Sequence, residues 1–74
     1  MRMADEEILV KMNLKREEFS KEIREKMRNS KPRITQRQMC ADLGFFPQNL
    51  CAFLNGRAKL SFKKVKMITD YLEM

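Results

Sequence analysis

The chain has 74 residues, enough for one domain with a single small core, and its 43% hydrophobic and 35% charged residues are ordinary for a chain that folds in water. No apolar run approaches the roughly 20 residues that span a membrane, and the acidic start at Asp5-Glu6-Glu7 differs from the basic start of a signal peptide. Only two Gly, two Pro and two Cys are present, which disfavours a turn-rich sheet and a disulfide-rich secreted fold. We therefore expect a compact all-α domain in the cytoplasm.

The N-terminal segment, residues 1–14, is predicted as an arm of uncertain structure that precedes a domain at residues 15–74. It contains a short apolar run, Ile8–Met12, whose periodicity cannot distinguish a strand from a helix. These apolar side chains could cover the core in place of a fifth helix, or they could form a contact between two subunits. Both interpretations stay open at this point.

A first helix is predicted at about Lys15–Arg28. Phe19, Ile23 and Met27 recur every four residues with charged residues between them, which is the apolar stripe of an amphipathic helix. The polar residues that follow lead to Pro32, which disfavours helical conformation in the residue before it. The helix is therefore expected to end before this proline.

A second, shorter helix is predicted between Thr35 and Gly44. The Thr35 hydroxyl can accept a hydrogen bond from a free N–H at the start of the helix, and Gln38 can bond back in a capping box. Met39 and Leu43 are expected to face the core. Gly44 ends the helix, because glycine adopts the left-handed conformation that follows many helices.

A third helix is predicted to begin at Pro47, whose fixed φ suits the first helical position. Leu50, Phe53 and Leu54 form its apolar face, and Asn55-Gly56 gives a second left-handed end signal. The second and third helices are thus joined by a very short turn. This is the spacing of a helix-turn-helix, in which the second helix of the pair can enter the major groove of DNA.

A fourth helix is predicted to begin after Ser61, whose hydroxyl can cap it. Val65, Ile68 and Leu72 share one face of this helix. Four helices, with the N-terminal segment as a possible fifth element, account for the chain.

The outer face of the third helix carries side chains suited to reading DNA bases. Outside its apolar face, this helix carries Gln48, Asn49, Ala52 and Asn55. A Gln or Asn amide can form two hydrogen bonds with the edge of adenine, and an Ala methyl can contact the methyl group of thymine. The alternative is that any two short helices with a Gly between them give such a pattern.

Positive charge is concentrated on the helix-turn-helix and its flanks. Between residues 26 and 68 there are ten basic residues and one acidic residue, whereas the first 25 residues are close to neutral. Lys63, Lys64 and Lys66 lie in the first half of the fourth helix, where cations oppose the helix dipole, so we expect them to contact phosphate. We expect the same of Arg37. A solvated surface without a ligand is the alternative for these charges.

The residues that carry a resemblance to a known family lie between Thr35 and Leu60. They are Thr35-Gln36, Cys40-Ala41, Gly44, Gln48, Leu50, Ala52, Asn55-Gly56 and Leu60. This pattern is similar to the helix-turn-helix of lambda-repressor-like regulators of the Cro/Xre type. The resemblance implies a four- to five-helix domain that binds operator DNA as a dimer and controls transcription.

The resemblance also implies roles for individual residues. Gln36 matches a position that bonds a phosphate and supports the recognition helix, and Asn55 matches a phosphate-contacting position after that helix. Arg57 and Lys59 lie in the following loop, where the family often contacts the backbone, and Lys63 follows them at the start of the fourth helix. Gln48, Asn49 and Ala52 match positions that face bases or adjacent backbone.

Three residues depart from the family pattern. Phe46 stands where the family usually has a polar N-cap, and Pro47 where many members have a base-reading Gln. We include both in the base-reading segment, although Pro47 can donate no hydrogen bond. Phe46 either contacts a thymine methyl or packs on Phe45 or the first helix. Leu54 is expected to pack on the fourth helix or on a partner subunit. The acidic N-terminal segment does not match the basic arm that some relatives wrap around DNA.

The sequence contains no His and only two thiols, Cys40 and Cys51, so we predict no metal site. Cys40 is expected in the core and Cys51 at least partly exposed. No nucleophile and base pair is evident, so we predict neither an enzyme nor a cofactor or small-molecule ligand.

The sequence therefore predicts a sequence-specific double-stranded DNA-binding regulator, most simply a repressor that occludes a promoter. Its recognition helix would be Pro47–Asn55, and a homodimer would bind a palindrome with recognition helices about 34 Å apart. The main alternative is a protein-binding module of the antitoxin or anti-repressor type that uses Phe46 and Leu54. RNA binding is disfavoured by few stacking aromatics. Membrane-surface binding by Lys15–Arg28 is disfavoured by its narrow apolar stripe.

Overall fold

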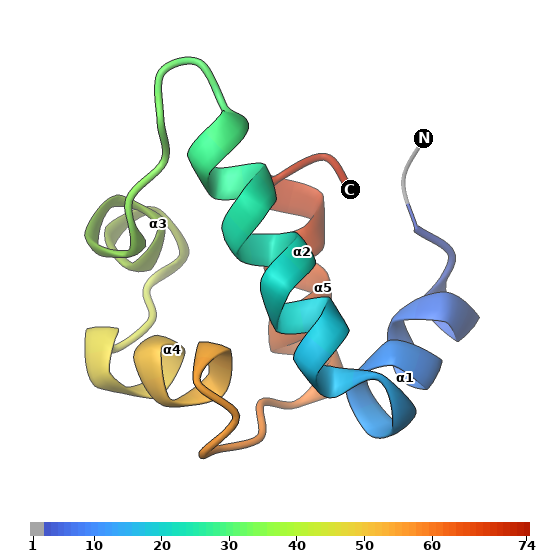
Figure 1. Cartoon of the computed structure of the whole chain (residues 1–74). Coiled ribbons are helices and arrows are strands. Elements are labelled where there is room, and N and C mark those ends of the chain that lie inside the picture. Colours follow the sequence, from blue (N-terminus) through green and yellow to red (C-terminus); the bar gives the residue numbers. More distant parts are fainter. Residues whose placement is uncertain (1–2) are drawn as a thin grey trace.

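The computed structural model describes residues 3–74 and contains, within that range, five helices and no strand. The helices are α1 (Asp5–Leu14), α2 (Arg16–Asn29), α3 (Gln36–Leu43), α4 (Pro47–Leu54) and α5 (Phe62–Tyr71). Figure 1 shows α3 and α4 to the left of α2 and α1 to its right. The predicted all-α class is confirmed, and the four helices expected from the sequence form within one or two residues of their predicted bounds.

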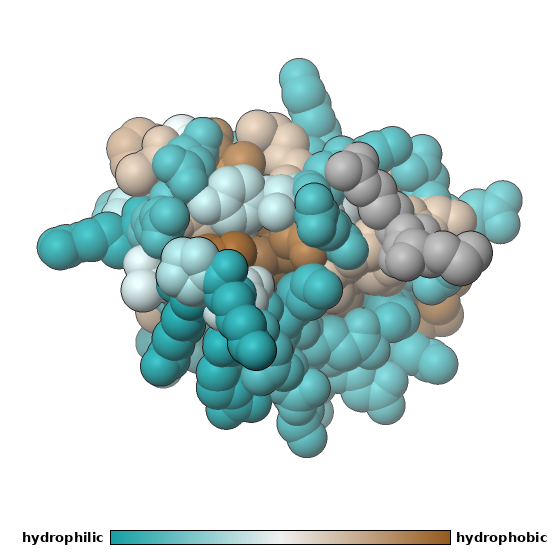
Figure 2. All heavy atoms as spheres, turned by 90° about the horizontal axis from the view of Figure 1, so that it is seen from above, coloured by the Kyte–Doolittle hydropathy of each residue, from teal (hydrophilic) through white to brown (hydrophobic). Residues whose placement is uncertain are grey.

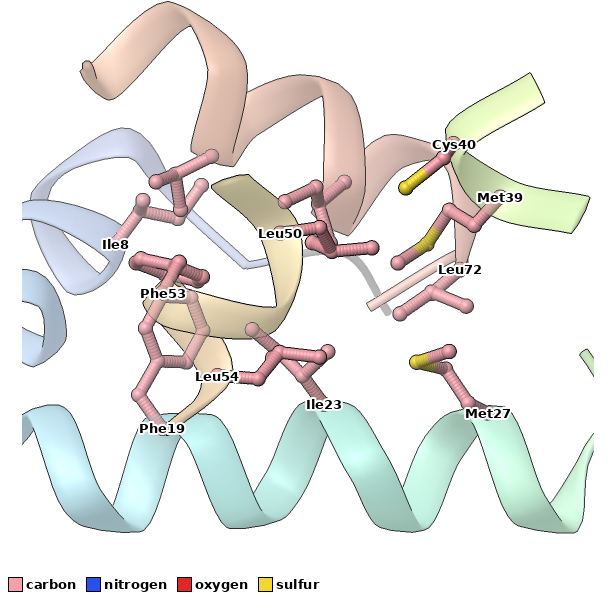
Figure 3. Packing of buried hydrophobic residues seen from close by; sticks show 12 residues of the cluster. Ile8, Phe19, Ile23, Met27, Met39, Cys40, Leu50, Phe53, Leu54 and Leu72 are labelled. Atoms are coloured by element: carbon pink, nitrogen blue, oxygen red, sulfur yellow. The ribbon is translucent and has the colours of Figure 1, made fainter. Parts of the chain in front are cut away.

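The hydrophobic core draws side chains from all five described helices. Its buried members are Ile8, Phe19, Ile23, Met27, Met39, Cys40, Leu50, Phe53, Leu54, Val65, Ile68 and Leu72. Figure 3 shows them converging between the helices. Each apolar stripe predicted on the first, third and fourth helices is therefore confirmed. Hydrophilic side chains cover much of the face drawn in Figure 2, and apolar residues are visible between them near the centre.

The helix ends follow from the predicted capping residues. The Gln38 N–H donates to Thr35 Oγ1 at 3.1 Å, and the Lys64 N–H donates to Ser61 Oγ at 3.4 Å. Among the hydrogen bonds of residues 3–74, none returns from the Gln38 side chain to the Thr35 N–H, so only half of the expected capping box forms. Gly44 ends α3 with a φ of 74°, in the left-handed region.

The described part of the N-terminal segment forms a helix that packs on the domain, which agrees with the alternative that its apolar residues cover the core. α1 packs against α2 and α5, and Ile8 is only 1% exposed. Lys11 Nζ lies 2.7 Å from a carboxylate oxygen of Glu22 on α2, and Lys66 Nζ on α5 lies 2.8 Å from Asp5 Oδ1. Residues 1 and 2 of the predicted arm lie outside the described range.

Only part of the apolar run on α1 reaches the core. Leu9 and Val10 are 42% and 46% exposed, so the buried positions give no regular stripe that could have revealed the helix. A different signal was available in the sequence. Asp5 and its two acidic neighbours lie in the first turn and Lys11 in the last turn, which is the charge order that the helix dipole favours.

Leu54 is buried inside the domain at 1% exposure. α4 packs against α2, and Figure 3 shows Leu54 beside Ile23 of α2. Of the two expectations for Leu54, the contact with a partner subunit is wrong, and the side chain packs inside the domain in the core that the fourth predicted helix, α5, also lines. This side chain instead fixes the end of α4 to the longest helix of the domain.

The two ends of the described chain meet. The Met3 N–H donates to the Met74 carbonyl at 2.6 Å, and the Met74 N–H donates to the Thr69 carbonyl at 2.9 Å. These bonds join the residues before α1 to those after α5. Within the part of the chain that the structure describes, no helix is long and apolar enough to cross a bilayer.

A phenol-carboxylate hydrogen bond links α5 to α3. The Tyr71 hydroxyl donates to Asp42 Oδ2. This bond requires the protonated phenol, and together with desolvation and the Asp42 charge it raises the pKa of Tyr71.

We expect Tyr71, the only tyrosine in the chain, to titrate above the ordinary value of about 10. Because the pKa is raised in the folded state, the contribution to stability is present below that ordinary value and is lost as pH rises through the folded pKa. Tyrosinate absorbance measures this directly. Asp42→Asn should lower the midpoint towards the ordinary value, and Glu25→Gln, at an exposed acid of α2, should leave it unchanged. Equal midpoints for the wild type and Asp42→Asn would contradict the assignment.

Candidate nucleic-acid interface

The two central helices are held by a tight turn and a shared apolar contact. The Phe45 N–H donates to the Cys40 carbonyl at 2.9 Å immediately after Gly44, and α3 packs against α4. Leu50 and Phe53 anchor α4 in the core at 0% and 2% exposure. The opposite face of α4 is thereby fixed towards the surface.

The predicted base-reading residues lie mainly on this outer face. At 3.6 residues per turn, positions 48, 52 and 55 fall opposite the buried side chains of α4, with Asn49 and Cys51 on its two flanks. Gln48 and Asn49 are exposed and Ala52 is half-buried. The Ala52 carbonyl accepts the N–H groups of the next loop, from Arg57 at 2.8 Å and Ala58 at 3.2 Å.

Phe46 is exposed, with a relative exposure of 69%, so it does not pack into the core. The predicted contact with a thymine methyl stays a prediction. Phe46 precedes Pro47, the first residue of α4, and gives no side-chain cap hydrogen bond. Phe46 and Asn49 line a groove of about 330 Å³ between the α3–α4 turn and the start of α5, and Lys63 and Lys64 line its other side. We call this the turn groove.

A second basic groove lies between the C-terminal half of α2 and the start of α3. Its volume is about 420 Å³, and Gln36 lines it together with Arg24, Arg28 and Arg33. We call this the arginine groove. The structure therefore places the predicted phosphate ligand Gln36 beside two arginines of α2 that the sequence analysis did not select. No acidic side chain is among the described residues that line either groove.

Asn55 has hydrogen-bond partners inside the protein. Its Nδ2 donates to Cys51 Sγ at 3.3 Å, and its Oδ1 accepts from Arg24 Nη2 at 3.4 Å. Arg24 Nη2 also donates to the Leu54 carbonyl at the end of α4. The Arg24 cation thus satisfies a terminal carbonyl and complements the negative end of the helix dipole.

Arg24 is the functional candidate that sequence reasoning missed. It is one of several charged residues between the apolar positions of α2, and its partner Leu54 lies 30 residues away in the chain. No local pattern signals such a contact. The only available hint was that Arg24 and Arg28 are four residues apart and therefore share one face of α2.

The remaining basic candidates separate into two groups. Arg37, Arg57, Lys59 and Lys63 are exposed, with Arg57 and Lys59 in the loop between α4 and α5. Lys66 does not belong with them, because it pairs with Asp5, and the hydrogen bond and charge of Asp5 raise the pKa of Lys66. The structure thus shows Lys66 as a link between α1 and α5, and the expected phosphate contact by Lys66 stays a prediction.

The two cysteines of the chain form no disulfide, and they lie in different environments. Cys40 is buried, and burial raises the pKa of its thiol, whereas Cys51 is exposed on α4. Within residues 3–74 there is no group of three or more His, Cys, Asp or Glu side chains arranged to hold a metal ion.

Comparison of the chain with protein-family models, with curated proteins and with solved structures found no match.

Proposed function

We propose that this domain binds double-stranded DNA sequence-specifically and regulates transcription as a lambda-repressor-like protein of the Cro/Xre type. The observation that carries the proposal is the exposed amide face of α4, together with two grooves of the domain that are lined by basic and not by acidic side chains. An α-helix fits the major groove, and the Gln48 and Asn49 amides can each bond an adenine edge. Exposed cations on the flanking elements supply phosphate contacts.

The proposed mechanism is occlusion of a promoter by a homodimer on a palindromic operator. Two copies of α4 would occupy successive major grooves about 34 Å apart. Phe46 would lie at the start of the recognition helix, where its ring can contact a thymine methyl. The proposal involves no catalysis and no cofactor. It implies a cytoplasmic location, and the free thiols of Cys40 and Cys51 suit a reducing compartment.

A salt titration of binding to an operator selected from random DNA tests the proposal. The exposed cations Arg37, Arg57, Lys59 and Lys63 would let a dimer neutralise about eight phosphates, so the slope of log K against log salt should be about −7. Replacing Arg57 by Gln should make the slope shallower by about 2, because two protomers each lose one contact.

Lys26→Gln is the matched control for this titration. Lys26 is an exposed cation on α2 outside both grooves, so its loss should leave the slope nearly unchanged. An affinity that does not respond to ionic strength would exclude the phosphate contacts on which the proposal depends.

A protein-binding module of the antitoxin or anti-repressor type is the second candidate, and the exposed ring of Phe46 favours it. Leu54 cannot take part in such a contact, because it is buried. A purified complex that survives nuclease treatment and is lost on Phe46→Ala would support this candidate over DNA binding.

A further inference from the structure

A third groove lies between the N-terminal part of α2 and the C-terminal end of α4. Its volume is about 620 Å³, and Arg16, Ser20, Lys21, Arg24 and Asn55 are among the residues that line it. We call it the α2–α4 groove. Neither the base-reading face of α4 nor the phosphate contacts expected from the sequence include Arg16, Ser20 or Lys21.

Two side chains in this groove have buried polar atoms without a partner. Arg16 Nε and Nη2 and Ser20 Oγ are buried and form no hydrogen bond, and Ser20 as a whole is 4% exposed. Buried polar groups are normally paired, because leaving one without a hydrogen bond costs free energy. Ser20 and Arg16 are one helical turn apart on α2, so a single ligand can reach both.

The Arg16 guanidinium contacts an aromatic ring, but two of its nitrogens have no hydrogen-bond partner. Its Cζ lies 5.5 Å from the centre of the Phe53 ring, a cation–π distance. This contact gives no hydrogen bond, so Arg16 Nε and Nη2 keep their N–H donors without a partner. Phe53 is a core residue, so the position of the guanidinium is tied to the packing of α4.

The side chains that line the groove carry a net positive charge, which favours the binding of an anion. Arg16, Lys21 and Arg24 line it against one acidic residue, Glu17. Both hydrogen bonds of Arg24 use Nη2, so its other guanidinium nitrogens are available. The ligand must offer several acceptor oxygens to a planar guanidinium and a hydroxyl, which a phosphate group does.

We propose that the α2–α4 groove binds a phosphate group, with Arg16 and Ser20 as its direct donors and Lys21 and Arg24 supplying further positive charge. The proposal does not depend on DNA binding. The phosphate can belong to a small free anion or to the backbone of a nucleic acid, and both sources offer the same oxygens.

Inorganic phosphate is the first probe, titrated into the DNA-free protein at constant ionic strength with chloride as the reference anion. We expect saturable changes in the backbone amide signals of Ser20, Arg24 and Gly56, and a melting temperature that rises with phosphate. Arg16→Gln and Ser20→Ala should each weaken phosphate binding about tenfold, the loss of a charge-assisted hydrogen bond. Arg16→Lys keeps the charge and most of the packing, so a similar loss in this variant separates ligand binding from misfolding.

Lys26→Gln, which removes an exposed charge of α2 outside the groove, should bind phosphate as the wild type does. Two results would overturn the proposal: no saturable response of the wild type, or equal responses of the wild type, Arg16→Gln and Ser20→Ala. The same variants, titrated with duplex DNA, identify the source. A lower DNA affinity with a salt slope shallower by about 1 per protomer assigns the site to the DNA backbone, and unchanged DNA affinity assigns it to a small anion. Phosphate binding by a protein that binds no DNA would refute only the proposed regulatory function.

Discussion

Replacing Ile8 by alanine is expected to lower the free energy of unfolding by about 2–5 kcal/mol. Ile8 is 1% exposed and is the buried side chain that α1 contributes to the core. Its truncation removes apolar contacts and leaves a cavity that the surrounding helices fill only in part. A domain of this size is stabilised by about 4–11 kcal/mol, so the loss is a large share of the total. Urea or guanidinium unfolding followed by circular dichroism measures it.

Leu14→Ala is the matched control on the same helix. Leu14 is 80% exposed, so its truncation should change stability by no more than about 0.5 kcal/mol. If Ile8→Ala cost no more than Leu14→Ala, the packing of Ile8 would contribute little to stability and α1 would not be an integral part of the core. A large difference between the variants supports α1 as an integral helix.

Gln48→Ala is expected to weaken binding to the selected operator by about 1–3 kcal/mol, a loss of about 5- to 150-fold. Gln48 is exposed on the face of α4 opposite the core, where its amide can form two hydrogen bonds with an adenine. Those bonds exist only on the correct sequence, so affinity for unrelated DNA should change little. Competition binding with the operator and with single-base variants measures both quantities.

Gln38→Ala is the control for this substitution. Gln38 is an exposed Gln of α3, and its cap contact uses the backbone N–H, which alanine retains. This variant should keep both the affinity and the sequence preference of the wild type. A uniform loss for Gln48→Ala on all DNA sequences would show that Gln48 does not read a base.

The sequence predicted those parts of the fold that depend on local patterns. Thr35 and Ser61 cap α3 and α5, Gly44 adopts the left-handed conformation that ends α3, and Pro47 is the first residue of α4. Each follows from the chemistry of one residue and its close neighbours. The apolar stripe on α2 was equally clear, because every fourth position is apolar.

The features that the sequence did not predict depend on contacts between distant segments. α1 lacks a regular stripe because only Ile8 of its apolar run is buried. Arg24 caps α4 from another helix, and the direction of Phe46 depends on how the α3–α4 turn meets α5. Lys66 looked like a free cation until the fold placed it against Asp5. Periodicity describes one segment at a time and cannot report such pairings.

The hydrogen bond between Met3 and Met74 brings the two ends of the described chain together, so labels or fusion partners at either end share one attachment region. Figure 1 shows α1 and the C-terminus to the right of α2, while α3 and α4 lie to its left. A fluorophore, a surface tether or a fused protein would therefore leave the domain at one place, whichever end carries it. A domain immobilised through either end would be held from the side of α2 that lies away from α3 and α4.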